Sequence, residues 1–567
     1  MSGKMKAVST GSSNLKKISA VALSVLTICT VSACKSNKAA ITEYSKPSFP
    51  SENSSAADNK TDSSVISDNS VQADENIPGS IFSVEEQERT NEKENKSESS
   101  SGRSEYARRD EIIINENTGT PIVSRAANEI KNRRNEILNS GNTEENYKIT
   151  GKKIYVSENG NDENDGLSPE TAVKNIFAAE LLSPKQGDAI LFERGSEFRI
   201  SEPINAIPGV VYGSYGKGEK PAIYASPKNY AIKTFWTPTK KKNVWVANYG
   251  YDDPGCIVFN WGEDAGIRKA NGLEQLVSNG QFYHNKLDSL LYLYCDKGNP
   301  GEVYSDIEIC ANIAIFYIDV GFTDITIDNL ALKYSAAGAV WGWYYPRGLT
   351  VTNCEMAWIG GNASSGQIRA GNAVQIWDGA TDCKIDNNWI YQVFDTAISW
   401  QGDNGHNYKN ISFSGNLIEY CAVGIEIWDH NKQNKDCKVE NFVCNDNIIS
   451  GIGYGWGNRK NDAGLRGIEG IISGSASNLG HFEMTMKNNI FDCSYSKFIH
   501  FKNSGFDGIK RKAVITGNTY YQKYTDYSPS LTDFEFQGQT VRITSQEIFE
   551  NAVRQFDSSP KKIEFLS

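Results

Sequence analysis

The sequence has few basic residues, and its cysteines and histidines form no grouping typical of a metal centre. Its 58 Lys and Arg are outnumbered by 69 Asp and Glu, which gives a net charge of −11. An acidic chain lacks the electrostatic footprint of a nucleic-acid-binding protein, and it would repel a strongly anionic polymer unless its binding site were locally basic. With 5 His and no CxxC pair, a zinc site is not expected either.

Long apolar runs are also scarce. Residues 18–31 form one such run, and it is too short to be a good membrane span. Basic residues precede it: Lys4, Lys6, Lys16 and Lys17. The run ends in Val31-Ser32-Ala33-Cys34, which resembles the lipobox of bacterial lipoproteins. The resemblance implies a signal peptide over residues 1–33, acylation of Cys34 and anchoring on the extracytoplasmic face of a bacterial membrane. The alternative is an ordinary secretory signal with a chance cysteine.

The next stretch is poor in aromatic residues. Residues 34–108 consist largely of Ser, Asn, Glu, Asp and Lys, a composition that cannot bury enough apolar surface to fold. This predicts a disordered tether, and a charged interaction tail is less favoured because neither sign of charge dominates for long. In the lead-in that follows, residues 109–150, helical spacing predicts an amphipathic helix over 121–139. Its apolar positions are Val123, Ala127, Ile130, Ile137 and Leu138.

Residues 325–518 contain a repeat. Short apolar strands each close on an asparagine, and successive asparagines are 24 to 42 residues apart. The asparagines are Asn329, Asn353, Asn388, Asn416, Asn447, Asn489 and Asn518. Between them lie second strands such as NAVQIWD at 372–378, TAISWQ at 396–401 and GIEIWD at 424–429. A unit of this length predicts a solenoid, because one coil cannot bury its inner face alone but a stack of coils can.

This repeat resembles the right-handed parallel β-helix proteins of the pectate-lyase-like superfamily, in which stacked asparagines form a ladder at a turn. The stretch at 152–198 resembles the N-terminal opening of many β-helix enzymes, and the likeness covers about residues 152–525. It implies an all-β fold. It does not choose a reaction, because the superfamily contains polysaccharide lyases, glycoside hydrolases and proteins that only bind.

The remaining segments are expected to decorate this solenoid. Residues 151–226 should open it and carry a capping helix with Ser168 at the N-cap and Pro169 in the first turn. Its buried face would comprise Val173, Ile176, Phe177 and Leu181. The acidic loop at 161–166 is interpreted as a turn rather than a calcium site, since it lacks a Glu at the twelfth position.

Three further segments complete the expected organisation. Period-2 aromatic and β-branched residues predict a small antiparallel insertion over 227–305. Coils follow over 306–525, and 526–567 form a C-terminal cap. There, Thr544 and Glu547 suggest a capping box ahead of a helix that contains Phe549, Val553 and Phe556. Of 11 Cys, nine follow Cys34, and alternation with apolar neighbours predicts free buried thiols.

Functional side chains are expected on the outer face of the second strand. Aligning the coils puts Val374, Ile398 and Ile425 inward. It therefore puts two sets of residues in outward columns, Gln375, Ser399 and Glu426 in the first and Trp377, Gln401 and Trp428 in the second. Trp341 and Trp343 would extend the columns one coil earlier, and His500 and Lys502 later.

Indole rings beside carboxylates and amides suit a sugar, whose apolar face stacks while its hydroxyls need polar partners. Gln375, Gln401, Trp343, Trp377 and Trp428 are the predicted substrate contacts. The alternative is that the tryptophans pack under loops. A polysaccharide or oligosaccharide substrate is expected, and the overall charge favours a neutral one.

Carboxylates stand where these strands end: Asp378, Asp403 and Asp429. Paired carboxylates on neighbouring coils can act as the acid and base of a glycosidase. The leading hypothesis is a glycoside hydrolase in which Asp403 and Glu426 form the central pair and Asp378 and Asp429 flank it. The alternative to a catalytic role is that some of these aspartates only cap turns.

Two other functions stay open. A polysaccharide lyase needs a base and a cation that neutralises a uronate, and it could use calcium. Its candidate basic residues are Arg347, Arg369, Lys409, Arg459 and Arg466. A non-catalytic glycan-binding lipoprotein would keep the tryptophans without needing the carboxylates. For the hydrolase no cofactor is expected, and the protein is expected to be a monomer.

Overall fold

A computed structural model describes residues 111–365, 368–429, 437–458, 462–463, 470–476, 479–502, 510–524, 533–536 and 539–566. These residues belong to one compact unit, Gly79–Ser567. The expected signal peptide, the lipobox cysteine Cys34 and the expected tether lie outside the described residues. Within the described ranges, no helix is both long enough and apolar enough to cross a membrane.

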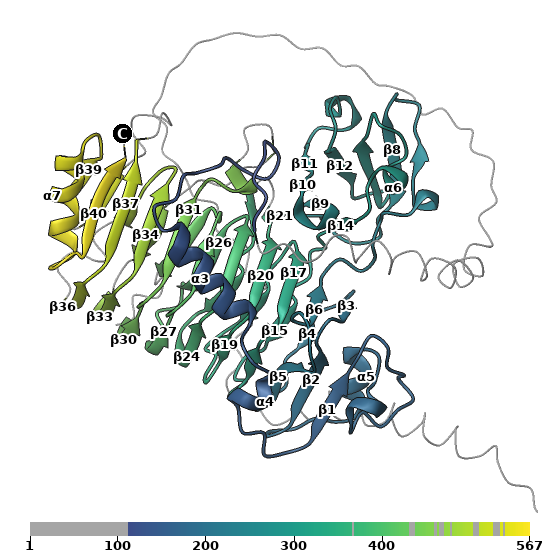
Figure 1. Ribbon diagram of the computed structural model, residues 1–567, viewed down its shortest axis with the longest axis horizontal. Coiled ribbons are helices and arrows are strands. Elements are labelled where there is room, and N and C mark those ends of the chain that lie inside the picture. Colours follow the sequence, from purple (N-terminus) through teal and green to yellow (C-terminus); the bar gives the residue numbers. More distant parts are fainter. Residues whose placement is uncertain are drawn as a thin grey trace, which may run out of the picture. The chain divides into compact units, whose positions relative to one another are not determined.

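Three long sheets of parallel strands form the body of this unit (Figure 1). Sheet 1 contains, in spatial order, β1 (Lys153–Val156), β2 (Ala189–Glu193), β5 (Val211–Tyr215), β16 (Thr326–Asp328), β19 (Thr350–Thr352), β24 (Ala380–Asp386), β27 (Tyr408–Ser412), β30 (Cys437–Val443), β33 (Leu479–Lys487) and β36 (Lys510–Thr516). Sheet 2 contains β3 (Glu197–Arg199), β6 (Ala222–Tyr224), β17 (Ala331–Ser335), β20 (Glu355–Ile359), β25 (Trp389–Val393), β28 (Leu417–Glu419), β31 (Ile448–Ile452), β34 (Ile490–Ser494), β37 (Thr519–Lys523) and β40 (Lys562–Leu566).

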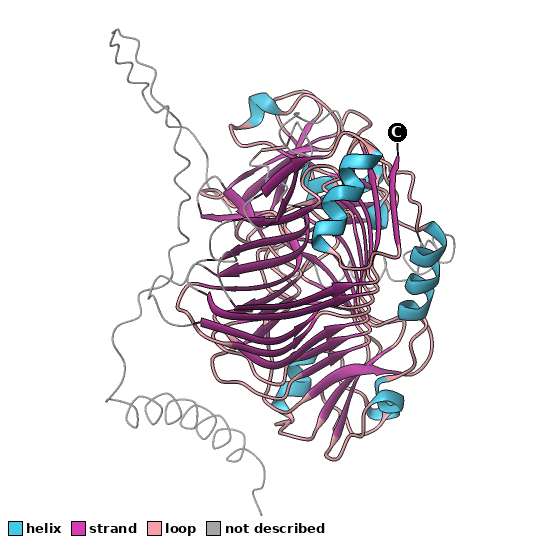
Figure 2. Ribbon diagram, turned by 90° about the vertical axis from the view of Figure 1, so that its left-hand side faces the viewer, coloured by secondary structure: helices cyan, strands magenta, loops and turns pink. Residues whose placement is uncertain are grey.

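Sheet 3 contains β4 (Ile204–Asn205), β15 (Phe316–Ile318), β18 (Val340–Gly342), β23 (Val374–Trp377), β26 (Thr396–Gly402), β29 (Val423–Asp429), β32 (Gly470–Ala476), β35 (Ile499–Lys502), β38 (Asp533–Phe536) and β39 (Gln539–Arg542). Its pairs are parallel except β38 with β39. Each coil visits sheets 1, 2 and 3 in turn, and the coils follow one another in sequence order (Figure 1). Figure 2 shows the strands stacked above one another. The chain is therefore a right-handed parallel β-helix, as its repeat predicted.

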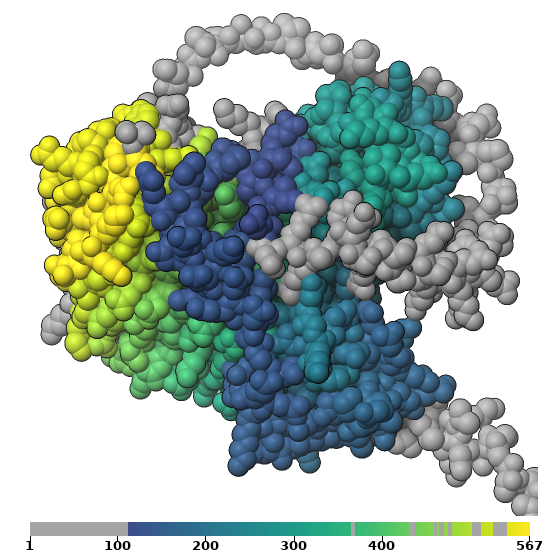
Figure 3. All heavy atoms as spheres, in the orientation of Figure 1, coloured from purple at the N-terminus to yellow at the C-terminus, as the bar shows by residue number. Residues whose placement is uncertain are grey.

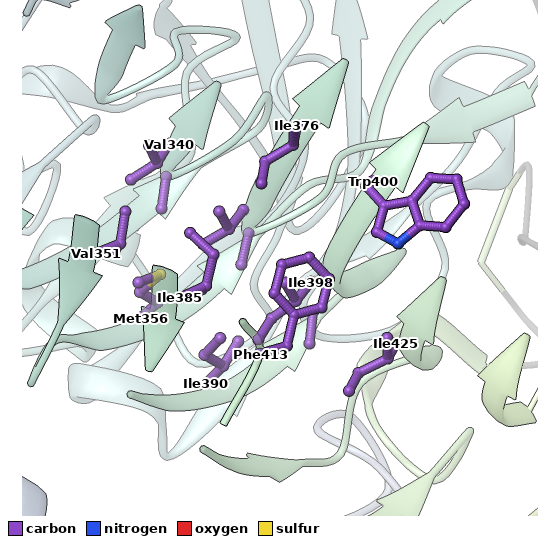
Figure 4. Close-up of a cluster of buried hydrophobic side chains, with 14 of the residues drawn as sticks. Val340, Val351, Met356, Ile376, Ile385, Ile390, Ile398, Trp400, Phe413 and Ile425 are labelled. Carbon is purple, nitrogen blue, oxygen red and sulfur yellow. The ribbon is translucent and has the colours of Figure 1, made fainter. Parts of the chain in front are cut away.

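The core runs through the inside of this stack. Val340, Val374, Ile398 and Ile425 follow one another in register on sheet 3, and each is fully buried. Figure 4 shows Val340, Ile398 and Ile425 in one cluster with Val351 and Ile385 of sheet 1, with Phe413 just after β27, and with Met356 and Ile390 of sheet 2. The predicted inward positions are confirmed. Because each coil contributes side chains at the same positions, the core continues from coil to coil.

An asparagine ladder lines the turn from sheet 1 to sheet 2. Side-chain amides donate from Asn388 to Asn416 (3.1 Å), from Asn416 to Asn447 (3.1 Å), from Asn447 to Asn489 (2.9 Å) and from Asn489 to Asn518 (2.8 Å). Asp557 ends the ladder by accepting from the Asn518 amide at 2.8 Å. All of these side chains are buried, so the stack satisfies its own donors and acceptors.

Two of the predicted ladder residues are wrong. The registers Ala331↔Glu355 and Glu355↔Trp389 put Leu330 and Cys354, rather than Asn329 and Asn353, at the ladder position. Asn329 and Asn353 lie one residue earlier, with φ of 63° and 52°. That turn position needs a left-handed backbone, which Asn adopts more readily than most residues.

Helical pieces close both ends of the core. The predicted N-terminal helix is in fact two pieces, a 3₁₀ turn (Pro169–Thr171) capped by Ser168 and helix α5 (Ile176–Leu181) capped by Asn175. Ile176 and Val173 join the core, whereas Leu181 is 85% exposed. Asp162 and Asp165 of the acidic loop accept hydrogen bonds from nearby backbone N–H groups, as turn residues do.

The C-terminal helix α7 (Gln546–Phe556) buries Phe549, Val553 and Phe556 in the same core. Its N-cap is Ser545, whose hydroxyl accepts from the Ile548 N–H at 3.3 Å, so the predicted capping box at Thr544 is wrong by one residue. Ser545 has extended backbone angles and a hydroxyl in reach, which is what the cap requires.

The predicted lead-in helix is α3 (Ala127–Leu138), followed by the short α4 (Thr143–Asn146). Helix α3 lies across the strands of sheet 2 (Figures 1 and 3). Ile130, Ile137 and Leu138 pack there against Trp389 and neighbouring apolar residues. Arg134 pairs with Glu419 at 2.9 Å, both nearly buried, so α3 covers this sheet as a fixed part of the fold.

An insertion built mainly of antiparallel pairs interrupts the coils, as predicted. One of its sheets has five strands, β7 (Thr237–Pro238), β8 (Val244–Asn248), β11 (Ile267–Arg268), β12 (Gln281–Asn285) and β13 (Leu290–Tyr294). The other contains β9 (Ile257–Phe259), β10 (Asp264–Ala265) and β14 (Ile307–Ile309). Short helix α6 (Pro300–Val303) belongs to the insertion, and a separate hairpin of β21 (Asn362–Ser365) with β22 (Ile368–Ala370) lies between β20 and β23. The nine cysteines after Cys34 are free and buried, as predicted.

Candidate functional site

Sheet 3 aligns its outward side chains as predicted. One column, called here the polar column, consists of Gln375, Ser399, Glu426, Ser473 and His500 in successive register. Trp341 precedes it on the previous coil. Two positions further along each strand lies a second set, called here the aromatic column, which consists of Trp343, Trp377, Gln401 and Trp428. The strand period places both columns on the outer face.

The rings of the aromatic column form a strip along the coils. Trp377 and Trp428 lie two coils apart, a backbone separation of about 9.6 Å, yet their ring centroids are 5.8 Å apart at an interplanar angle of 27°. Both rings therefore lean toward each other over Gln401. Trp343 extends the strip, with its centroid 5.7 Å from that of Trp377. All three rings are partly exposed.

The polar column is buried rather than open. Gln375 is 8% exposed, Glu426 4% and His500 2%. Side chains three residues before the column positions, on the turn from sheet 2 or at the start of the sheet 3 strand, contact it. Asn372 donates to the Ser399 hydroxyl at 3.0 Å, Thr396 to Glu426 Oε2 at 3.2 Å, and Lys497 Nζ lies 3.0 Å from His500 Nε2. The aromatic column is thus the more open of the two.

Gln401 joins the two columns. Its side-chain Oε1 accepts from Gln375 Nε2 at 3.2 Å, and its side-chain Nε2 donates to Glu426 Oε2. One oxygen of Glu426 therefore accepts hydrogen bonds from both Gln401 and Thr396. These bonds fix the orientation of the Glu426 carboxylate.

Asp378 and Asp429 do not point outward with this face. Asp429 is in register with Gly402, and both aspartates are essentially buried. A Cβ atom on Gly402 would lie 3.2 Å from Asp378 Oδ1 and 3.2 Å from Asp429 Oδ2, so the two carboxylates converge on this glycine. Asp378 accepts from the N–H groups of Asp403 (3.2 Å) and Asn404 (3.1 Å). Asp378 therefore caps a turn, which was the alternative to a catalytic role.

The buried carboxylates affect a neighbouring phenol. The Tyr408 hydroxyl donates to the backbone carbonyl of Gln401 at 2.7 Å. Burial, followed by the charge of Asp429, raises the pKa of Tyr408 well above its usual value. Tyr408 is therefore a structural donor that holds the end of β26 rather than a base.

Asp403 occupies a different position from the other two aspartates. Strand β26 carries Gly402 where the neighbouring coils carry aspartate, so Asp403 falls one residue later, where it is partly exposed. It is on the coil adjacent to Glu426, as predicted. However, Ser399 is the register partner of Glu426, so Asp403 lies four positions, or about 13 Å, further along the strand direction. The aromatic column runs between these two carboxylates.

Of the basic residues predicted for a lyase, those that the structure describes do not gather on this face. Arg369 is 2% exposed and donates to the carbonyls of Gly361 (2.7 Å), Gly255 (2.6 Å) and Ala463 (2.9 Å) while pairing with Asp462. Its guanidinium lies 4.2 Å from the Phe394 ring. Arg369 is thus a buried clamp between the insertion and the coils.

The other basic candidates lie elsewhere. Arg347 lies 4.9 Å from the Tyr345 ring, and Lys409 is an exposed residue of sheet 1. Arg459 and Arg466 lie outside the described residues. The structure brings Lys497 and His500 to the column instead. Periodicity found His500, whereas no sequence signal marked Lys497.

The rest of the described residues offer neither a metal site nor a sugar-stacking pocket. In the described ranges, no three His, Cys, Asp or Glu side chains gather as ligands of a metal ion would. A shallow hollow of about 250 Å³ lies beside α3, away from sheet 3. It is lined by Glu129, Asn132, Arg133, Glu136, Asp446, Ile448, Asn488 and Ile490. Because no aromatic ring lines it, it does not offer a sugar-stacking surface.

Comparison with known proteins finds only distant similarity. No family model matches the chain, and no curated protein does. Among solved structures, it is similar to XylC in complex with xylose, at 13% identity and a TM-score of 0.38, covering 70% of this chain and 90% of that one. It is also similar to the GH136 lacto-N-biosidase of Eubacterium ramulus, at 14% identity and a TM-score of 0.34, covering 70% and 66%.

A third similar structure is that of pectate lyase Pel9A, at 13% identity and a TM-score of 0.30, covering 66% of this chain and 70% of that one. Similarity at this level gives no information about function. The fold rests on the strand registers of the protein itself.

Proposed function

We propose that this protein is a carbohydrate-active enzyme that binds a glycan along the aromatic column of sheet 3. The observation that carries the proposal is the pair of Trp377 and Trp428 rings leaning over Gln401, which is hydrogen-bonded to Glu426. Indole faces stack on the apolar face of a sugar, and amide and carboxylate groups between them can bind its hydroxyls. The three rings of the aromatic column are partly exposed, so part of each indole surface is open to a ligand.

The reaction we propose is hydrolysis. Glu426 lies two positions before the aromatic column and Asp403 two positions after it, so a sugar bound on the rings would have a carboxylate on either side. Their backbones are too far apart for the retaining separation of about 5 to 5.5 Å. In this proposal Glu426 and Asp403 supply the acid and the base, and Asp378 and Asp429 support the turn.

The second candidate is a polysaccharide lyase, and one observation favours it. Lys497 and His500 form a basic pair in the same column as Glu426, and abstraction of a proton next to a uronate carboxylate needs a base. Calcium would be a cofactor only for this reaction.

A glycan panel with product analysis separates these functions. A lyase product carries an unsaturated uronate that absorbs in the ultraviolet, and a hydrolase product does not. On the best substrate, Glu426→Gln and Asp403→Asn should each lower turnover by about 10² to 10⁴-fold. The matched control is Glu440→Gln on sheet 1, which should turn over normally.

Near-normal turnover in both carboxylate variants would remove the hydrolase assignment at this site. Loss of activity in a His500→Gln variant, with an ultraviolet-absorbing product, would favour the lyase instead. Binding without turnover on any glycan would leave a non-catalytic binding protein as the function.

We also propose that the domain acts at a bacterial cell surface as a lipid-anchored monomer. The sequence at Cys34 supports this location. A Cys34→Ser variant should be released in soluble form with the same melting temperature. If that variant stayed on membranes through a salt wash, the lipoprotein assignment would be wrong.

A further inference from the structure

The five-stranded sheet of the insertion has one buried face and one partly exposed face. Phe282, Leu291 and Leu293 point to the buried face and join the core of the insertion. Successive side chains of a strand point to opposite faces, so the residues next to these point the other way. They form the partly exposed face, called here the tyrosine face, which consists of Tyr283, Tyr292, Tyr294, Leu290 and Val246.

Two rings of the tyrosine face are nearly parallel. Tyr283 and Tyr292 lie directly opposite each other on the antiparallel strands β12 and β13. Their ring centroids are 6.2 Å apart, and their ring planes meet at 25°. Asn285 and Asn248 flank Leu290 on the two neighbouring strands and add amide groups at one edge. The face therefore combines aligned aromatic rings with hydroxyl and amide groups.

The strands that carry the tyrosine face are uncharged. Strands β8, β12 and β13 contain no Lys, Arg, Asp or Glu, although 22% of the chain is charged. The outer face of sheet 1, by contrast, carries Lys409, Glu440 and Glu483. Exposed strand faces usually carry such charges because they keep the sheet soluble. An aromatic surface without them favours a neutral ligand.

The side chains of this face favour a sugar over a second protein surface. A tyrosine offers an apolar ring that stacks on the CH face of a sugar, and its hydroxyl can bind sugar hydroxyls. Protein partners are usually selected by complementary charges, and the tyrosine face offers none. A neutral glycan needs only rings and uncharged polar groups.

Two arginines hold the insertion to the coils. Arg268 of β11, in the same five-stranded sheet, donates to the Gly361 carbonyl at 3.2 Å. Arg369 donates to the Gly255 carbonyl at 2.6 Å. The tyrosine face and the aromatic column of sheet 3 therefore belong to one compact unit, and a polymer bound at one remains available to the other.

We infer that the tyrosine face is a second glycan-binding site, which holds a neutral polysaccharide while another part of the same chain occupies sheet 3. This inference rests on the proposed function, because it concerns the same class of ligand. A surface of this kind binds a short oligosaccharide only weakly, since it has no charged partner for it. Its effect is on polymers, because two sites that engage one chain raise its apparent affinity.

The test compares polymers with short oligosaccharides. Affinity electrophoresis measures retention of the purified protein by β-mannan, β-galactan and linear β-xylan, and calorimetry measures affinity for the matching tetrasaccharides. On the polysaccharide that retains the protein best, the double variant Tyr283→Ala/Tyr292→Ala should be retained about 10-fold less. Its affinity for the tetrasaccharide should be unchanged, because that ligand binds at sheet 3.

Matched variants separate the rings from the fold. Tyr283→Phe/Tyr292→Phe keeps the rings and should keep most of the retention. Tyr524→Ala removes a ring that is 47% exposed outside the insertion, and it should be retained normally. Melting temperatures are compared first. If the double alanine variant does not fold, Tyr292→Thr replaces it, because threonine is a good strand residue and lacks the ring.

Three results would overturn the inference. The first is no retention of the unaltered protein by any of the three polysaccharides, and the second is unchanged retention of the double alanine variant. The third is a dimer in sedimentation that this variant abolishes, since a second copy would then cover the face.

These results are distinct from failure of the proposed function. In each of the three cases Trp377→Ala should still weaken binding of the tetrasaccharide, which would leave the proposed function standing. If Trp377→Ala changed binding of neither the tetrasaccharide nor the polymer, the proposed function itself would fail.

Discussion

The ladder turn and the face of sheet 3 use the same coil repeat in opposite ways. At the ladder, one side chain type recurs on five coils, so each amide bonds to its copy on the next coil. In the polar column, the residue type changes from Gln375 to Glu426 to His500. Each ladder amide bonds to its copy on the next coil and also donates to a backbone carbonyl, so the same pattern of partners repeats at every coil. In the polar column the side chain differs from coil to coil, so the residues cannot all hydrogen-bond to identical neighbours. They bond instead to side chains outside the column.

This difference separates stability from recognition within one fold. The ladder specifies only that coils stack, because every coil presents the same asparagine at this position. The sheet 3 columns present a different group at each coil, which is what is needed to recognise a polymer whose units are not all alike. Breaking the ladder should therefore unfold the protein, whereas breaking the columns should change binding.

The largest effect is expected at the ladder. Asn447→Ala removes bonds to Asn489 (2.9 Å) and to the Phe413 carbonyl (2.8 Å), and it leaves buried donors of Asn416 without an acceptor. We expect unfolding to become easier by on the order of 3 to 5 kcal/mol, similar to truncation of the core residue Ile425 to Ala. Chemical denaturation measures both changes.

The matched control for the ladder is Ser399→Ala in the polar column. Ser399 is as buried as Asn447, and the hydrogen bond at stake joins it to Asn372 at 3.0 Å. Its loss should cost about 1 kcal/mol. If Ser399→Ala cost as much as Asn447→Ala, the distinction between the ladder and the column would not hold.

A smaller effect is expected in the aromatic column. Trp428→Ala removes one of the two rings that lean over Gln401, so the best oligosaccharide should bind about 10-fold more weakly, or ~1.4 kcal/mol, while the melting temperature stays nearly constant. Calorimetric titration measures this loss. Tyr283→Ala, which removes a partly exposed ring from the insertion, is the control and should bind normally. An equal loss in both variants would show that the sheet 3 strip has no special role.

The sequence predicted the coils better than it predicted the turns. Period-2 alternation correctly predicted the inward isoleucines and both outward columns, because successive side chains of a strand point to opposite faces. The doublets Asn387-Asn388 and Asn488-Asn489 show why the ladder was partly misassigned. The left-handed turn position and the ladder position are adjacent, and both favour asparagine, so Asn329 looks like a ladder residue although it is not.

The site was harder to predict because it depends on contacts across turns. Burial of Glu426 comes from Thr396 on the previous coil, and the shift of Asp403 comes from Gly402 taking the place of an aspartate. Neither has a periodic signature. Lys497 illustrates the same limit, since its contact with His500 spans a turn rather than a strand.

Glu180 is a third kind of buried polar group, different from both the ladder and the polar column. Its substitution gives the smallest expected change in stability. Glu180 on α5 has one carboxylate oxygen that is buried and has no hydrogen-bond partner among the described residues. It has neither a copy on the next coil nor a partner from a turn. Burial, followed by the nearby charge of Glu202, raises the pKa of Glu180 from its ordinary 4.5 to about 7.

The sign of the pH effect follows from this shift. Between pH 4.5 and 7 the folded protein holds a proton on Glu180 that the unfolded chain has released, so stability falls as pH rises through this window. Above pH 7 the buried charge costs the fold on the order of 1 kcal/mol once its partial exposure is allowed for. Glu180→Gln should therefore stabilise the protein at pH 8 and have little effect near pH 4.5, as measured by melting temperature across this range. The control, Glu163→Gln in the exposed loop at 161–166, should show no such pH dependence. A pH-independent gain in Glu180→Gln would mean that packing, rather than an unpaired charge, distinguishes this position from the ladder.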